Sequence, residues 1–428
     1  MTAVSAPTEI IPAVHARLPT LTGMRFLAAL LVFVFHAATV FDYPDGETAA
    51  DVGWLTGKLA FLGVSFFFVL SGFVLTWSVR SGDTAARFWR RRACKIYPNH
   101  LVTFLLAVAL LLALHKPVTG WWQNLLLIHA WFPDQAIFNS ANVVSWSLAC
   151  EAVFYLLFPL LHRWLVRIPC STLWWWACGS VVAVLCMPLL AQALVPATGG
   201  DPTQPGSSLS QVWFLYIFPP VCLLQFVLGM VMARIVLSGR WIGLPLPLAA
   251  VLLLGGYALA LVVPYNFGVN ATTIVPVALV IAAGAVADVR GTATLLRGRV
   301  AVWLGEVSFA FYLVHYLVLL HGRELAGIQG SGDVVVELAV LTGAMALSLC
   351  LAWLLYVGVE RPFMRRWSRP RGSARPPQRR RQPARPPQRQ RGPVTGRQHG
   401  GRVARGDAVL PQHGGQVASG PRPRERRW

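Results

Sequence analysis

The chain has 428 residues, of which 55% are hydrophobic and only 13% are charged. It contains repeated apolar runs, each long enough to cross the roughly 30 Å of a bilayer's hydrocarbon, and a soluble protein could not bury so many of them. Most of the formal net charge of +20 comes from residues 364–428, which hold 18 arginines and two acidic residues. The composition therefore excludes a soluble globular protein and indicates an all-α, polytopic membrane protein.

Hydropathy predicts ten membrane spans. Their approximate bounds are 22–41, 60–79, 97–115, 143–162, 172–194, 212–236, 245–263, 271–289, 300–320 and 334–357. Basic residues are concentrated in alternate connections, whereas the opposite connections carry only Lys58, Lys116 and Arg323. By the positive-inside rule, this asymmetry predicts a multi-pass protein of the cell membrane with both termini in the cytoplasm.

Three regions follow along the chain. Residues 1–20 are expected to be a cytoplasmic segment, without the apolar core of a removable signal peptide. Residues 21–367 form the predicted membrane domain. Residues 368–428 are rich in Arg, Pro, Gln and Gly, so we expect a disordered tail that binds the anionic headgroups of membrane lipids. No nucleic-acid motif accompanies these arginines, and we expect no nucleic-acid partner.

The first span carries two ionisable residues, Arg25 and His36, with only apolar or small residues between them. Eleven helical steps come close to three full turns, so both side chains share one face, about 16 Å apart along the axis. Ionisable residues inside a membrane span favour a functional role, with His36 as a general base. The alternative is an arginine that extends toward the headgroups and a histidine that is hydrogen-bonded within the bundle.

The next candidate is the basic run RFWRRRACKIYPNH, which we expect near the inner ends of spans two and three. Together with the preceding arginine, it supplies six cations: Arg80, Arg87, Arg90, Arg91, Arg92 and Lys95. Arginine makes bidentate contacts with phosphate oxygens, so the run could bind the phosphates of an acyl-CoA. Setting the membrane topology is the alternative role.

Span four contains a carboxylate, Glu151, in WSLACEAVFYLLFPLL. Ser147 and Tyr155 lie four residues to either side, so one helical face presents a hydroxyl, a carboxyl and a phenol. Glu151 could orient a protonated His36 or bind a sugar-like hydroxyl. The alternative is a buried glutamate held by neighbouring helices.

Span nine adds Tyr312 and His315, which share a helical face. His315 could line the same cavity as His36 or simply satisfy a contact between helices. The seven cysteines form no CxxC pair, so neither a metal site nor a disulfide framework is predicted.

Five stretches together resemble the integral-membrane acyltransferase-3 family, which includes sugar O-acetylases and actinobacterial macrolide and glycoside O-acyltransferases. In chain order they are LTGMRFLAALLVFVFHA, FLGVSFFFVLSGFVLTW, RFWRRRACKIYPNH, WSLACEAVFYLLFPLL and LGEVSFAFYLVHYLV, with VERPF after the last. The resemblance covers residues 18–367. It implies ten core helices, acyl-CoA as donor, with acetyl-CoA expected, and a carbohydrate hydroxyl as acceptor.

The resemblance also assigns roles to single residues. His36 matches the family's proposed catalytic histidine, Arg25 the arginine paired with it, and Glu151 the glutamate of the fourth stretch. Arg91 and Arg92 fall in the family's basic element, and Lys95 stands where many members have arginine. No soluble hydrolase-like domain follows the spans, which implies a stand-alone transferase.

We therefore expect a membrane O-acyltransferase without a permanently bound cofactor. Acyl-CoA would bind at the basic run, and His36 would deprotonate the acceptor, a carbohydrate or glycoside. Four further residues are expected at the substrate: Ser147, Tyr155, Tyr312 and His315. One alternative acceptor is a small diffusible metabolite such as a macrolide sugar. An alternative of another class is a proton-coupled transporter that uses His36, Glu151 and His315 as a relay.

Overall fold

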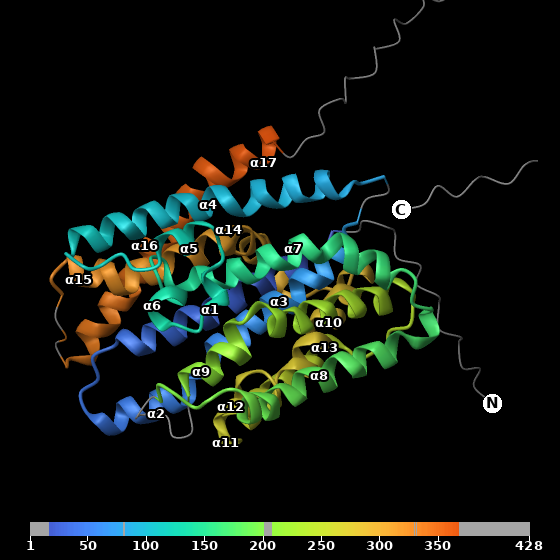
Figure 1. Ribbon diagram of the computed structural model, residues 1–428, viewed down its shortest axis with the longest axis horizontal. Coiled ribbons are helices and arrows are strands. Elements are labelled where there is room, and N and C mark those ends of the chain that lie inside the picture. Colours follow the sequence, from blue (N-terminus) through green and yellow to red (C-terminus); the bar gives the residue numbers. More distant parts are fainter. Residues whose placement is uncertain (1–16, 80–81, 201–207, 329, 331, 368–428) are drawn as a thin grey trace, which may run out of the picture. The chain divides into compact units, whose positions relative to one another are not determined.

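The computed structural model describes residues 17–79, 82–200, 208–328, 330 and 332–367. The regular structure of these residues is entirely helical, and nine helical stretches among them are long and apolar enough to cross a membrane. Figure 1 shows the long helices lying alongside one another. The prediction of an all-α, polytopic membrane protein is confirmed. Arg80, the tail from residue 368 and most of the expected N-terminal segment lie outside the described residues.

The long helices follow the predicted spans closely. Their bounds are α1 Pro19–Val40, α3 Leu59–Trp77, α4 Ala85–Ala113, α7 Trp146–Leu165, α8 Leu173–Leu194, α10 Pro219–Leu237, α11 Leu246–Val262, α13 Ile274–Val289, α14 Arg299–Tyr316 and α16 Val334–Leu355. With 17 residues, α11 lies at the lower limit for crossing a bilayer, and α13, with 16, forms one candidate span together with α12. The orientation of the termini stays a prediction.

Shorter elements connect these helices. The α-helical ones are α2 Gly46–Thr56, α5 Trp121–Leu125, α6 Gln135–Phe138, α9 Leu209–Val212, α12 Tyr265–Val269, α15 Arg323–Leu325 and α17 Arg361–Trp367. Segments of π-helix, which often occur at functional sites, are η4 Trp213–Ile217, η6 Leu317–Gly322 and η7 Tyr356–Glu360. Of these, η6 directly continues α14.

The centre of the bundle is the contact between α3 and α10. At Gly72 of α3, a Cβ would collide with the Phe226 carbonyl, and at Gly229 of α10 it would collide with the Val69 carbonyl. Small residues at such crossings let two backbones approach closely, which is how helices associate in lipid. Phe226 and Phe154 of α7 stack beside this crossing, with ring centroids 4.9 Å apart. The glycines and phenylalanines fix the positions of α3 and α7, both of which contribute to the site below.

The basic run differs from its predicted placement, because it is part of a helix. The helix α4 begins at Ala85, where the Thr84 hydroxyl accepts a hydrogen bond from the Arg87 backbone N–H, rather than near residue 97. Its 29 residues span about 43 Å, more than the hydrocarbon thickness, so its basic first turns extend beyond the apolar layer. The helix therefore holds these cations at fixed angles around its axis.

A buried ion pair joins α1 to α16 at the other end of α1. Arg323 donates hydrogen bonds to both carboxylate oxygens of Glu337, at 2.6 and 2.7 Å, and one to the Val40 carbonyl at 3.2 Å. Glu337 is completely buried. The last turn of α1, next to His36, is thereby tied to the start of α16.

Candidate active site

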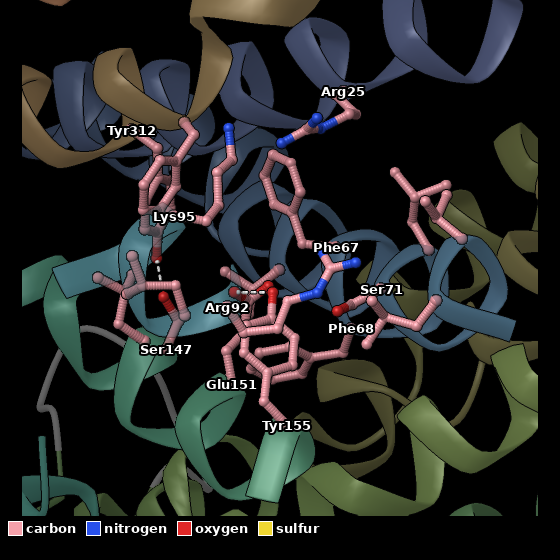
Figure 2. A pocket seen from close by; sticks show the side chains of 17 residues that line it. Arg25, Phe67, Phe68, Ser71, Arg92, Lys95, Ser147, Glu151, Tyr155 and Tyr312 are labelled. Carbon is pink, nitrogen blue, oxygen red and sulfur yellow. Dashed lines mark hydrogen bonds between the residues drawn. The ribbon is translucent and has the colours of Figure 1, made fainter. Parts of the chain in front are cut away.

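A cavity lies among α1, α3, α4, α7 and α14 (Figure 2). Its empty space, the opening to solvent included, is about 900 Å³. Arg25 and Arg92 lie near the starts of α1 and α4, and Leu75 lies near the end of α3, so the cavity is close to the end of the bundle that we predict to be cytoplasmic. Its polar lining residues are Arg25, Ser71, Arg92, Lys95, Ser147, Glu151, Tyr155 and Tyr312.

Three cations face this cavity: Arg25, Arg92 and Lys95. Lys95 forms an ion pair with Glu360, a buried acid that also accepts a hydrogen bond from Asn99 at 2.7 Å. The side chain of Arg25 makes no hydrogen bond or ion pair with any residue that the structure describes. Its guanidinium therefore keeps its donors available for a ligand.

The guanidinium of Arg92 lies against aromatic rings. Its central carbon is 5.4 Å from the ring centroid of Phe88 and 5.7 Å from that of Tyr155. These cation–π contacts help to hold the guanidinium beside the cavity.

Glu151 is the acidic group of the cavity. It accepts a hydrogen bond from the Tyr155 hydroxyl at 2.8 Å, and the charges of Arg25 and Arg92 act on it through space. Ser147, one turn earlier, bonds instead to the hydroxyl of Tyr312, at 2.9 Å. The hydroxyl, carboxyl and phenol expected on one face of this helix all line the cavity.

His36 and His315 form a hydrogen-bonded pair deeper in the bundle. His36 Nδ1 is 3.0 Å from His315 Nε2, and His315 Nδ1 is 2.8 Å from the Tyr312 carbonyl oxygen. Because a carbonyl can only accept, His315 Nδ1 carries a proton, and Nε2 of the neutral ring is an acceptor. His36 Nδ1 must then donate, which leaves the lone pair of His36 on Nε2. The contact thus assigns the basic nitrogen of His36.

The histidine pair and the cavity are neighbours. His36 and His315 do not line the cavity, and His36 lies about 16 Å along α1 from Arg25. Tyr312 connects the two places, because its side chain lines the cavity and its ring centroid is 5.8 Å from that of His315. Phe67 of α3 also lines the cavity, and its ring contacts Tyr312 edge-on at 5.9 Å. Both aromatic rings therefore form the wall nearest the histidines.

Glu151 and His36 make hydrogen bonds to different residues, and the expected orienting role of Glu151 stays a prediction. The carboxylate of Glu151 bonds to Tyr155, whereas the ring of His36 bonds to His315 and packs against Tyr316, with centroids 4.6 Å apart. The two residues lie on helices whose polar faces meet at different depths. Spacing along one helix cannot reveal the depth at which another helix crosses it.

The basic side chains of α4 point in different directions from the helix. Arg92 and Lys95 line the cavity, whereas Arg87 and Arg90 are exposed and do not. Arg91 forms an ion pair with Asp83 instead. The helix turns only some of these cations toward the cavity, and the expectation that the run binds acyl-CoA stays a prediction.

Two residues of this region escaped the sequence analysis. Glu360, the partner of Lys95, is the acid of the VERPF stretch, and it lies too far along the chain from Lys95 for the sequence to pair them. Phe67 lies in the FFFVLSGF run, where nothing distinguishes it from the neighbouring phenylalanines.

Comparison with known proteins identifies the family. The family model described as an acyltransferase domain matches residues 18–357. Acyltransferase MdmB of Streptomyces mycarofaciens is 42% identical over 372 residues, which are 84% of this chain and 95% of the relative. The O-acetyltransferase OatA of Staphylococcus aureus is 31% identical over 176 residues, or 35% of this chain and 25% of the relative. The peptidoglycan O-acetyltransferase OatA of Listeria monocytogenes is 26% identical over 167 residues. No solved structure matches the chain.

The fold and the comparisons together define a multi-pass membrane enzyme of the acyl-transferring class. The chain belongs to the acyltransferase-3 family, and it transfers acyl groups other than aminoacyl groups. The protein is located in the cell membrane, like its bacterial relatives. The transporter alternative gains no support, since the family model and these relatives are acyltransferases.

Proposed function

We propose that the protein transfers an acyl group, with acetyl expected, from acyl-CoA to a hydroxyl of a carbohydrate or glycosylated acceptor. The observation that supports this proposal is the cationic cavity beside the His36–His315 pair, in which His36 Nε2 carries a lone pair that can accept a proton. The names of the O-acetyltransferase relatives support acetyl transfer to oxygen.

The donor assignment is supported by the charge of the cavity. Three cations face it, and Glu151 is the one acid among its lining residues. Lys95 is already paired with Glu360, whereas the Arg25 side chain has no hydrogen bond or ion pair among the described residues, so Arg25 is the first group expected to bind the phosphates, with Arg92 lining the same cavity. The pantetheine arm of CoA separates these phosphates from the thioester. A donor with its phosphates at Arg25 would therefore place its thioester further along α1, toward His36.

The base assignment is supported by the tautomer of the histidine pair. His36 Nε2 would accept the proton of the acceptor hydroxyl as its oxygen attacks the thioester carbonyl. His315 Nε2, which accepts the hydrogen bond from His36 Nδ1, would stabilise the resulting imidazolium. When the tetrahedral intermediate collapses, the C–S bond breaks and His36 returns its proton to the sulfur of CoA. The ester and free CoA are the products, and the histidine is neutral again.

The acceptor side of the site would be formed by polar groups on α7 and α14. Ser147, Tyr155 and Tyr312 supply hydroxyls in the cavity, and Glu151 supplies a carboxylate, a set suited to the hydroxyls of a sugar. A small diffusible glycoside is the second candidate acceptor. The relative whose name points to a polymeric acceptor, the peptidoglycan O-acetyltransferase OatA, is matched over only 23% of its length, so a small acceptor is tested beside the polysaccharide.

Activity in proteoliposomes tests the function and the base together. Wild-type protein should release CoA from acetyl-CoA when given a glycoside acceptor. His36→Ala should lower the rate by at least a hundredfold, since general-base catalysis contributes about 10²–10⁴-fold. His162→Ala, at the end of α7 and outside the cavity, is the matched control. Retention of more than about a tenth of the activity in His36→Ala would refute the base assignment.

The acceptor is identified by mass spectrometry of cells that express either the wild-type gene or the His36→Ala variant. A mass increase of one acetyl group on a cell-surface glycan would select the polysaccharide acceptor, and the same increase on an extractable glycoside would select the small one. The absence of any acyl-dependent difference would contradict the proposed reaction.

A further inference from the structure

A second hollow lies on the other side of α1, away from the active site. It runs between α11 and the pair α1 and α3, and its empty space, open solvent included, is about 1880 Å³. Its lining is almost wholly apolar and includes Leu31, Phe66 and Leu253. Along α11 it extends from Leu246 to Tyr257, which is about 16 Å.

This groove exists because α11 packs on one side only. The helix buries just two side chains, Ala249 and Ala260. At Gly256 it approaches α13 so closely that a Cβ would touch the Thr272 carbonyl. Leu254, by contrast, lines the groove and is 71% exposed. An apolar space of this size loses dispersion contacts unless another apolar molecule fills it.

One end of the groove is polar and fixed. The Thr20 hydroxyl bonds to Asp288 at 2.6 Å and to the Thr294 hydroxyl at 2.8 Å, which ties α1 to the end of α13. Arg290, the residue after α13, also lines the groove. Within the described part of the chain, the side chain of Arg290 makes no hydrogen bond and no ion pair. The groove therefore offers a long apolar channel that ends at an available cation.

We propose that this groove binds one phospholipid of the surrounding membrane, with an acyl chain along α11 and its phosphate at Arg290. The charge at the end of the channel matches an anionic headgroup. The groove is separate from catalysis, because Met24 lines the groove whereas Arg25 lines the active-site cavity. His36 lies more than one turn beyond Leu31, the last residue of α1 in the groove. The bound lipid fills the gap that α11 leaves and attaches this helix to the bundle.

Native mass spectrometry tests the proposal on full-length protein. The protein is reconstituted in nanodiscs of equimolar phosphatidylcholine and phosphatidylglycerol, transferred to detergent and weighed. We expect one retained phospholipid per chain, with phosphatidylglycerol enriched about fivefold. Ala250→Trp places an indole in the groove and should abolish retention. Val251→Trp, on the same helix but outside the groove lining, should retain the lipid.

A second pair of variants tests the headgroup contact. Arg290→Gln should remove the enrichment of phosphatidylglycerol, whereas Arg299→Gln, which is exposed and outside the groove, should keep it. If Ala250→Trp does not fold, this pair decides the question alone. The proposal is overturned if the wild type retains no phospholipid or if Arg290→Gln keeps the enrichment. Displacement of the lipid by acetyl-CoA or a glycoside would likewise overturn it, since the groove would then be a substrate site.

Discussion

Replacement of His315 tests whether the histidine pair determines the basic nitrogen of His36. His315 accepts from His36 Nδ1 at 3.0 Å and is completely buried, so no solvent can take over its part. A hydrogen bond to a group that becomes charged contributes about 1.5–3 kcal/mol, which corresponds to roughly ten- to a hundredfold in rate. His315→Phe should therefore lower kcat by this factor and leave the KM for acetyl-CoA nearly unchanged, because the phosphates bind elsewhere.

The conservative variant separates this role from simple packing. A glutamine side chain can place its carbonyl oxygen near the position of histidine Nε2, so His315→Gln should recover most of the activity lost in His315→Phe. Steady-state kinetics in proteoliposomes, with equal protein content verified after reconstitution, provides the measurement. Equal losses in both variants, or a loss that appears mainly in KM, would refute the tautomer argument.

Three further predictions follow from the contacts. Arg92→Ala should raise the KM for acetyl-CoA by about tenfold or more, because it removes a cavity cation proposed to bind the phosphates, whereas Arg91→Ala should change the KM less than about threefold. Similar effects of both variants would contradict the division of the basic run. Glu337→Ala should lower the free energy of unfolding by about 3–5 kcal/mol, because it removes the carboxylate that pairs with Arg323. A thermal-unfolding midpoint equal to that of the wild type would contradict this prediction. Deletion of residues 369–428 should change the specific activity in proteoliposomes by no more than a few-fold, because that segment has too few apolar residues to join the core. A hundredfold loss of activity with normal membrane insertion would show that the segment takes part in catalysis.

Several features of the fold could be predicted because they depend on local patterns. Each span is a long apolar run, so the helix boundaries lie within a few residues of their predicted positions, except at the starts of α4 and α10. At α4, the charges of the basic run conceal a helix that continues beyond the hydrocarbon layer. Likewise, the spacing of Glu151 and Tyr155 is a property of one helix, and these two side chains do meet.

The remaining features depend on contacts between distant segments, which no local pattern specifies. The pairing of His36 with His315 requires α1 to lie against α14 at one particular depth. The partner of Lys95 lies 265 residues away in the chain. The periodicity of a sequence indicates which face of a helix is polar. It does not indicate which other helix this face contacts, because that depends on how the helices pack, for example at the crossing of α3 and α10 at Gly72.

The arrangement also explains why Arg25 and His36 share a helix. In the proposed reaction, His36 acts at the thioester of the donor and Arg25 at its phosphates, and a rigid helix keeps the two residues about 16 Å apart along its axis. Both ends of α1 are held independently, by Thr20 at Asp288 and by Val40 at Arg323. A shift of α1 along its axis would break both contacts at once. The position of His36 relative to the cavity is therefore determined by the packing of the whole helix rather than by the site alone.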